Sequence, residues 1–308
     1  MAGLISGSGG GITHLFRQLT IRDCIFENCS AGRYGGAIYS IDAPIAVERS
    51  TFTNNYVISA DGGAIFSRGP LTIIDSVFFN NRAGRQGGAI TAYGPTTIDH
   101  CTIVNNRSNA DGVGDGNGGG VRTVNSVLTL SSSIIAHNRN GAPGADAPDD
   151  LSGRLDSAGY NIISAVTEQT IIDGDVANDL IEVDPLLGPL DTAEDLPFYP
   201  LRPGSPAIDA ASGDCAIYDL RGRARPFDGD NDGVARCDIG AVEYRVTQGD
   251  MNCDNAITVS DIGGFVLALT QPNTYEATFP GCERFNADAN GDGALTVSDI
   301  SDFIGLLQ

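Results

Sequence analysis

A repeated glycine motif constrains the fold of this chain more than any other feature. It recurs at intervals of 26, 27, 25 and 31 residues, and the last interval is long because of the insertion NADGVGDGN. The copies are GGGI at 9–12, GGAI at 35–38, 62–65 and 87–90, and GGGV at 118–121. A fixed period of this length predicts a repeat architecture in which each unit stacks on the next.

A second unit, with alternating apolar residues, lies between the glycine pairs. Its copies are CIFEN at 24–28, STFTN at 50–54, SVFFN at 76–80, CTIVN at 101–105 and the weaker SIIAH at 133–137. Short apolar segments separated by glycine-rich turns are typical of strands and not of helices. About 25 residues per turn therefore predicts a parallel β-helix, in which coils lie roughly 4.8 Å apart and equivalent residues form columns.

The alignment of the five units assigns a role to each column. A small column and an aromatic or aliphatic column are expected to face inward, and an asparagine column is expected to occupy a turn. Asn tolerates a left-handed backbone there, and its amide is expected to bond along the stack. The glycine pair marks a corner that admits neither a Cβ nor an ordinary φ. The small column is Cys24, Ser50, Ser76, Cys101 and Ser133, the apolar column is Phe26, Phe52, Phe78, Ile103 and Ile135, and the asparagine column is Asn28, Asn54, Asn80 and Asn105.

The charge of the chain restricts its partners. All 18 basic residues are Arg, and 39 acidic residues give a net charge of -21. Such a chain is a poor match for nucleic acid or an anionic membrane, whereas acidic loops suit a calcium-rich extracellular setting. No apolar run approaches 18 residues, so we expect no membrane span. The first residues lack the features of a signal peptide, and we expect any leader to be missing from this sequence.

The repeats and the segment after them resemble two families of bacterial surface proteins. The pattern CxFxxN…GGAI is similar to the repeats of polymorphic outer-membrane proteins, which are right-handed β-helices. SAGYNII at 157–163, DPLLGPL at 184–190, RPGSPAIDA at 202–210 and the motif DLRGRARP…CDIGAVE at 219–243 resemble a choice-of-anchor Q domain. Together the resemblance covers roughly 9–244. It implies β-helix coils over 1–165, the C-terminal part of that domain over 166–247, and a disulfide between Cys215 and Cys237.

Catalysis is the main alternative, because pectate lyases and polygalacturonases share this architecture. Such enzymes need carboxylates that hold calcium beside a basic residue, or two carboxylates at a set separation. The position before the small column is charged in several repeats, as Asp23, Arg49, Asp75 and His100, and we interpret it as a charge ladder between coils. No nucleophile or base can be named, so we expect a non-catalytic protein and keep a polysaccharide lyase or glycoside hydrolase as the alternative.

Two acidic segments are candidates for calcium in addition to the C-terminal region. Asp228, Asp230 and Asp232 before Gly233 match the beginning of a calcium loop, although Ile239 stands where the last ligand would be. A calcium site and a solvated acidic turn are equally compatible with this pattern. The insertion around Asp111 and Asp115 is better interpreted as a glycine loop than as a cation site.

The C-terminal region contains two matched loops, each followed by a helix-like pattern. Oxygen-bearing residues at alternate positions converge on a hard cation such as Ca²⁺. The apolar residues after each loop recur at helical spacing, at 262, 265, 266 and 269 and at 300, 303, 304 and 307. The expected ligands are Asp250, Asn252, Asp254, Ala256, Thr258 and Asp261 in the first loop and Asp288, Asn290, Asp292, Ala294, Thr296 and Asp299 in the second.

This region, 248–308, differs from a standard EF-hand pair and resembles a type I dockerin. Asp stands in the place of the final Glu, and no helix is expected before either loop. The resemblance implies a cohesin-like partner, which would be read at Val259-Ser260 and Val297-Ser298. Asn255 and the long linker 271–286 depart from the family pattern, and an oxidising compartment would permit a Cys253–Cys282 disulfide.

The sequence thus predicts a mainly β protein: a right-handed, pectate-lyase-like parallel β-helix followed by a small α-helical, dockerin-like calcium domain. We expect it to be secreted or on a cell surface and attached through a cohesin-like partner, with a polysaccharide as a further candidate ligand of the solenoid. Cys24, Cys29 and Cys101 are left as free thiols, because Cys24 and Cys101 stand three coils apart, roughly 14 Å.

Overall fold

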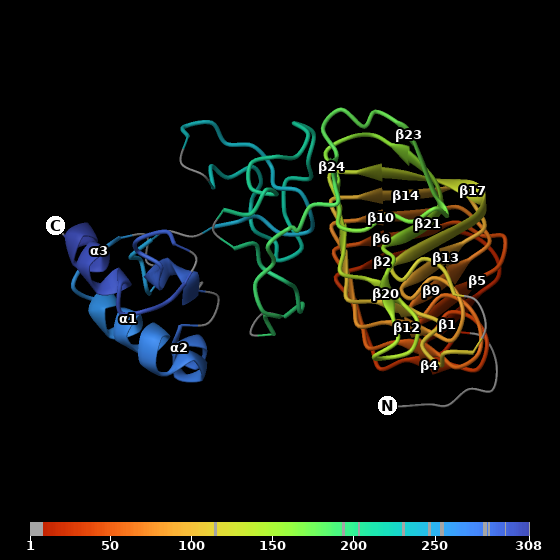
Figure 1. Cartoon of the computed structure of the whole chain (residues 1–308), viewed down its shortest axis with the longest axis horizontal. Helices are drawn as coiled ribbons and strands as arrows, with labels where there is room; N and C mark the ends of the chain where they lie inside the picture. Colours follow the sequence, from red (N-terminus) through yellow and green to blue (C-terminus); the bar gives the residue numbers. More distant parts are fainter. Residues whose placement is uncertain are drawn as a thin grey trace.

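The computed structural model shows a stack of β-coils, an irregular segment and a small helical module in chain order (Figure 1). The structure describes residues 9–113, 116–192, 195–202, 204–229, 232–245, 248–252, 256–279, 282, 284–292 and 294–307. None of the helices in these ranges is long and apolar enough to cross a membrane.

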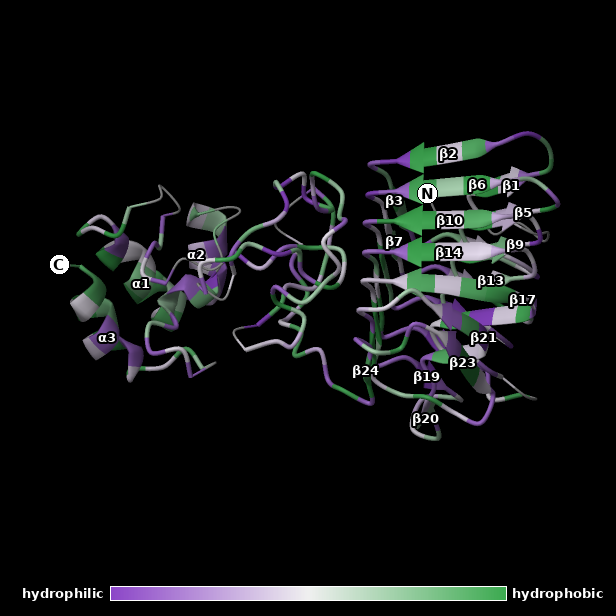
Figure 2. Cartoon of the chain, turned by 90° about the horizontal axis from the view of Figure 1, so that it is seen from above, coloured by the Kyte–Doolittle hydropathy of each residue, from purple (hydrophilic) through white to green (hydrophobic). Residues whose placement is uncertain are grey.

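Eleven strands form one broad parallel sheet that wraps two sides of the solenoid (Figure 2). Its first row is β1 (Ile12–His14), β5 (Ile38–Ser40), β9 (Ile65–Ser67) and β13 (Ile90–Ala92), and its second row is β2 (Leu19–Arg22), β6 (Ile45–Glu48), β10 (Leu71–Ile74) and β14 (Thr96–Asp99). The rows meet in β17 (Val121–Ser131), on which β21 (Leu151–Ser157) and β23 (Thr170–Gly174) stack.

Two narrower sheets complete the cross-section. The seven-stranded sheet contains β3 (Ile25–Glu27), β7 (Thr51–Thr53), β11 (Val77–Phe79), β15 (Thr102–Val104), β18 (Ile134–Ala136), β22 (Ile162–Ile163) and β24 (Leu180–Ile181). The six-stranded sheet contains β4 (Ser30–Ala31), β8 (Tyr56–Val57), β12 (Arg82–Ala83), β16 (Arg107–Ser108), β19 (Arg139–Asn140) and the antiparallel β20 (Ala147–Pro148).

The register of the strands confirms the predicted apolar column. Phe26 pairs with Phe52 and Phe52 with Phe78 on adjacent coils. Their rings stack with centroids 4.7 and 4.5 Å apart. Aliphatic residues of the other sheets fill the rest of the interior. The repeat therefore builds one continuous core by placing each residue over its equivalent.

The glycine corner is confirmed in both of its aspects. Gly35, Gly62 and Gly87 have φ values of 60°, 74° and 61°, which side chains rarely adopt. The second glycine of each pair leaves no room for a Cβ: one on Gly63 would overlap the carbonyl oxygen of Gly88 in the next coil. The pair thus permits the backbone of one coil to touch the next.

The prediction for the asparagine column is correct for the turn and wrong for the amide ladder. Asn28, Asn54, Asn80 and Asn105 have φ between 54° and 57°, as expected for the turn. The amide ladder, however, belongs to the residue after each turn. Its members are Asn55, Asn81, Asn106 and Asn138, and every amide Nδ2 donates at 2.9 Å to the next side chain, the last to Asp150. The turn points the first side chain outward, so the second enters the core.

The small column also forms a polar ladder. The hydroxyl of Ser50 accepts the backbone N–H of Cys24 at 3.2 Å, and the hydroxyl of Ser76 accepts that of Ser50 at 3.1 Å. Each serine also donates to the carbonyl two residues before it. Serine is therefore suited to this corner, because its hydroxyl bonds backbone N–H and C=O groups that have no partner in a strand.

The two rows of the broad sheet are separate in the first coils and continuous in the fifth. Prolines stand between the rows of the second to fourth coils, at Pro44, Pro70 and Pro95, where they remove a backbone N–H from strand pairing, whereas the first coil has LFRQ at 15–18. Residues 121–131 carry no proline and run as one strand, β17. Local sequence therefore changes the cross-section without breaking the stack.

In the described part of 182–245, here called the irregular segment, the chain forms isolated bridges and no named strand or helix. It packs against the outer face of the seven-stranded sheet: Phe198, Leu201 and Ile239 cluster with Val104 and Ile134. The chain thus folds back on its own coils before it reaches the C-terminal module (Figure 1).

The C-terminal module contains α1 (Asp261–Thr270), α2 (Pro272–Thr278), the 3-10 helix η1 (Arg284–Ala287) and α3 (Asp299–Leu306). The helices α1 and α3 follow the two loops as predicted. The linker was expected to have no helix before the second loop, and this was wrong because α2 and η1 lie in it. PNTYEAT has no apolar periodicity, and only Tyr275 of α2 is buried.

Candidate functional site

The two loops of the C-terminal module share one hydrogen-bond pattern. The carboxylate of Asp261 accepts the backbone N–H of Asn252 at 3.1 Å and of Thr258 at 2.8 Å. In the second loop the carboxylate of Asp299 accepts the N–H of Asn290 at 3.4 Å and of Thr296 at 2.8 Å. The last residue of each loop thus closes it from the first turn of a helix.

The hydroxyl and amide side chains repeat in the same way. Ser260 lies 2.6 Å from the Thr258 hydroxyl and accepts the Asn252 amide at 3.1 Å. Ser298, Thr296 and Asn290 form the same triad with the same distances. Two segments 38 residues apart therefore have one local structure, as their matched sequences predict.

The donor chemistry of these loops suits a hard cation. Asp250, Asp261, Asp288 and Asp299 are almost fully buried in the loops, and carboxylate oxygens are the ligands that Ca²⁺ prefers. Ala256, Asp292 and Ala294 lie in the described loops, whereas Asp254 lies outside the described residues. In the ranges that the structure describes, no three acidic, His or Cys side chains are gathered as metal ligands. Calcium in these loops stays a prediction.

The predicted apolar stripes are only partly buried. Phe265 and Phe303 stack with centroids 4.0 Å apart and join the module core. Leu269 and Leu307 are partly buried against that core. The remaining stripe residues and the valine at the tenth position of each loop are exposed, and they form one apolar triplet per loop and helix: Val259, Ile262 and Val266, and Val297, Ile300 and Ile304.

The acidic loop at 228–233 bonds to its own backbone. Asp228 accepts the N–H of Asp232 at 3.1 Å and of Gly233 at 3.0 Å. Asp232 pairs with Arg236 at 3.0 Å, and that hydrogen bond lowers its pKa. Asp230 lies outside the described residues. These contacts describe an acidic turn, and a third calcium site there stays a prediction.

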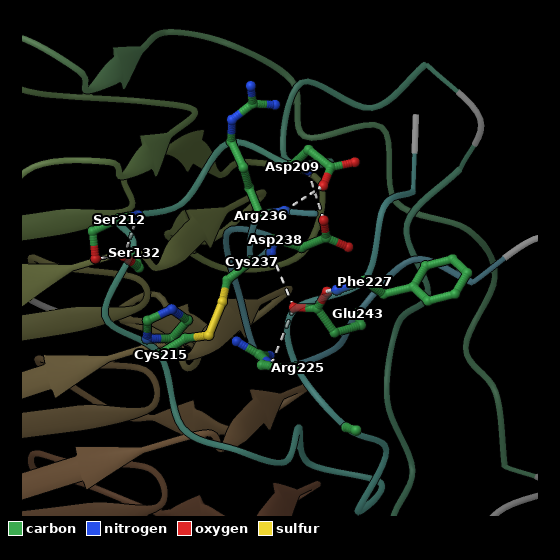
Figure 3. Close-up of a disulfide and its surroundings, with 12 residues drawn as sticks. Ser132, Asp209, Ser212, Cys215, Arg225, Phe227, Arg236, Cys237, Asp238 and Glu243 are labelled. Atoms are coloured by element: carbon green, nitrogen blue, oxygen red, sulfur yellow. Dashed lines mark hydrogen bonds and ion pairs between the residues drawn. A yellow bond between two sulfur atoms is a disulfide. The ribbon is translucent and has the colours of Figure 1, made fainter. Parts of the chain in front are cut away.

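Buried carboxylates organise the irregular segment, and sequence reasoning missed them (Figure 3). Asp238 accepts the N–H groups of Asp209 and Tyr244, and Glu243 accepts those of Asp238 and Phe227. Burial and the neighbouring Glu243 raise the pKa of Asp238. These oxygens bond the backbone where no strand supplies a partner.

Asp219 also accepts backbone N–H groups of the irregular segment, but it is paired with an arginine. It accepts the N–H groups of Arg221, Arg223 and Glu243 and the Arg221 guanidinium. Burial raises its pKa, but Arg221 and the N–H donors outweigh that and hold it below the ordinary value. The motif DLRG…CDIGAVE was available in the sequence as the signal for this network.

The predicted charge ladder forms only in part. Arg49 pairs with Asp23 of the preceding coil at 2.8 Å. Asp75 instead faces Arg225 of the irregular segment at 3.9 Å, and burial raises the pKa of Asp75 to about 7. His100 contacts its neighbour Asp99 at 3.0 Å. Asp23 and Arg49 therefore form an ion pair between coils, whereas Asp75 contacts the irregular segment.

The cysteine predictions agree with the structure where it can be compared. Cys215 and Cys237 form the disulfide that the resemblance implied, and Cys24, Cys29 and Cys101 are free thiols. Cys101 is buried, whereas Cys24 and Cys29 are partly exposed. Cys282 is disulfide-bonded, and its expected partner Cys253 lies outside the described residues.

Comparison with known proteins supports the class that the fold defines, a repeat protein with a β-helix-like solenoid. The family model of the Chlamydia polymorphic membrane protein repeat matches residues 49–68 and 75–93. These segments lie in the coils of β7 to β9 and β11 to β13. No curated protein and no solved structure matches the chain significantly.

Proposed function

We propose that this chain is an extracellular or cell-surface protein whose right-handed β-helix is held in place by a calcium-dependent, dockerin-like module at 248–308. The main support for this proposal is that equivalent residues of the two loops form the same hydrogen bonds. The match to a surface-protein repeat supports the location, and the net charge of -21 agrees with a calcium-rich environment.

The exposed triplets supply the contact surface in this proposal. Val259 and Val297 are 76% and 80% exposed, although a small domain normally buries such residues. Each valine is followed by a serine that is fixed by its loop. A cohesin-like domain is the proposed partner, and the likeness of the two surfaces allows it to bind in either orientation.

Calcium titration of the full chain tests the module. We expect two bound ions by native mass spectrometry, and one fewer in Asp250→Ala and in Asp288→Ala, because each removes the first ligand of one loop. Chelation should lower the melting temperature of the module, since ligands assembled only on folding link binding to stability. Asp302→Ala on α3 is the matched control. Unchanged uptake in both loop variants would refute the calcium assignment.

Pull-down with a cohesin domain tests attachment. We expect capture by the full chain in calcium and none with chelator. Val259→Asp and Val297→Asp should each leave binding largely intact, whereas the double variant should lose it. If Val297→Asp alone abolishes capture, the two surfaces are not equivalent.

A further inference from the structure

A groove runs across three coils where the seven-stranded sheet turns into the six-stranded sheet. It has a volume of about 590 Å³, within the range of roughly 300–1,000 Å³ that is typical of ligand sites. Its lining includes Asn54, Asn80, Tyr56, Ile58, Arg82 and Asp111. This feature is independent of the C-terminal module.

The side-chain amides that line the groove form no hydrogen bond in the described part of the chain. Asn28, Asn54 and Asn80 point outward from successive turns, one coil apart. The equivalent Asn105 already has a partner, because its amide donates to the Tyr199 hydroxyl of the irregular segment at 3.2 Å. The groove therefore offers a row of unused donors and acceptors at coil spacing, roughly 4.8 Å.

Arg82 in the groove lining is the unpaired end of an arginine column. Arg82, Arg107 and Arg139 are paired in register on consecutive strands. Asp146 contacts both Arg107 and Arg139, at 2.5 and 2.6 Å. No acidic side chain in the described ranges pairs with Arg82, although acids outnumber arginines in the chain by 39 to 18. An exposed guanidinium without an acidic partner favours an anionic ligand.

We propose that this groove binds a uronate-bearing oligosaccharide. A sugar carboxylate pairs with Arg82, neighbouring hydroxyls bond the amides of Asn54 and Asn80, and a sugar face packs on Tyr56, whose ring is partly exposed. A peptide added as a strand is disfavoured, since β8 and β12 each have a paired strand on both sides and offer no free edge.

Calorimetric titration of the full chain with trigalacturonate tests this inference. EDTA is present, so that calcium bridges between the acidic protein and the sugar do not contribute. We expect trigalacturonate to bind and the neutral trisaccharide maltotriose to bind at least tenfold more weakly. Arg82→Ala should weaken trigalacturonate binding about tenfold or more, because a charge-assisted hydrogen bond is lost. Rising salt should weaken it as well.

Two further variants separate recognition from folding. Asn80→Asp keeps a residue that tolerates positive φ and adds a like charge, so it should weaken trigalacturonate binding and leave the melting temperature nearly unchanged. Arg68→Ala removes an exposed arginine outside the groove, beside Tyr93, and should leave affinity unchanged. The inference is overturned if trigalacturonate does not bind, if Arg68→Ala weakens it as much as Arg82→Ala, or if hexaglutamate binds equally well.

Discussion

The solenoid and the irregular segment satisfy buried backbone groups in opposite ways. In the solenoid, strand pairing satisfies most of them. Neutral Asn and Ser side chains bond the rest at the corners of most coils, and Asp149 and Asp150 do so at the last corners. In the irregular segment a few buried carboxylates each hold several N–H groups. Repetition spreads the polar contacts over many equivalent residues, whereas the irregular segment concentrates them in a few charged ones. The two regions should therefore respond differently to substitution and to pH.

The largest effect should come from Arg225, the buried counter-charge of the irregular segment. Its Nε lies 3.3 Å from Glu243, and its Nη2 donates to the Gly240 carbonyl at 2.8 Å. Arg225→Met leaves the Glu243 carboxylate buried without its partner, at a cost of about 3–5 kcal/mol. Urea-induced unfolding measures this loss.

A control for this substitution is Arg154→Ala, which breaks the exposed pair with Asp173 at 3.0 Å. It should cost less than about 1 kcal/mol. Similar losses in the two variants would show that the irregular segment does not depend on its buried charges, and the contrast drawn above would fail.

Asp149 is a buried carboxylate at the solenoid corner, and it should make that region pH-sensitive. Burial raises its pKa to about 6, while one oxygen accepts the Gly118 N–H at 2.9 Å. A raised folded-state pKa contributes stability that is present below pH 4 and is lost as the pH rises through 6. The shift corresponds to up to about 3 kcal/mol.

Unfolding of Asp149→Asn at several pH values tests this contribution. Between pH 4 and pH 7 the wild type should lose about 2 kcal/mol relative to the variant, which cannot titrate at this position. Asp156→Asn, at an exposed position of β21, should follow the wild type at every pH. Parallel curves for wild type and Asp149→Asn would contradict the assignment.

The smallest of these effects belongs to a single rung of the amide ladder. Asn81→Ala leaves buried donors and acceptors of the adjacent coils without partners and should cost about 1–3 kcal/mol in chemical unfolding. Asn80→Gly, one residue earlier, keeps the left-handed turn and should cost a few tenths of a kcal/mol. An equal loss at both positions would place the stabilising amide in the turn, as the sequence first suggested.

The solenoid was predictable because each of its contacts repeats along the sequence. The strands, the glycine corner and the phenylalanine stack follow from columns that recur every coil. The ladder was assigned one residue early because Asn stands at both positions of Asn54-Asn55 and Asn80-Asn81. The recurrence of Asn at 55, 81, 106 and 138 was the available signal, and only the turn geometry decides which amide enters the core.

Contacts that occur once left no periodic signal. The bond from the Asp209 N–H to Asp238 joins residues 29 apart at 2.7 Å, and no second copy of it reveals the pairing. In the C-terminal module the loops were predictable from matched spacing. The burial of their helices was not, because helical periodicity cannot tell an apolar residue that packs, such as Phe265, from one that stays exposed, such as Ile262.

The glycine corner also governs how a protein of this kind can change in length. Because the backbone of one coil touches the next at residues such as Gly63 and Gly88, the vertical rise there cannot stretch to admit extra residues. The longest interval between glycine pairs, 31 residues, instead gains its length before Gly118 and leaves the corner unaltered. Lineages of such solenoids would therefore grow and shrink by whole coils, with the glycine pair as the boundary of each added or deleted unit.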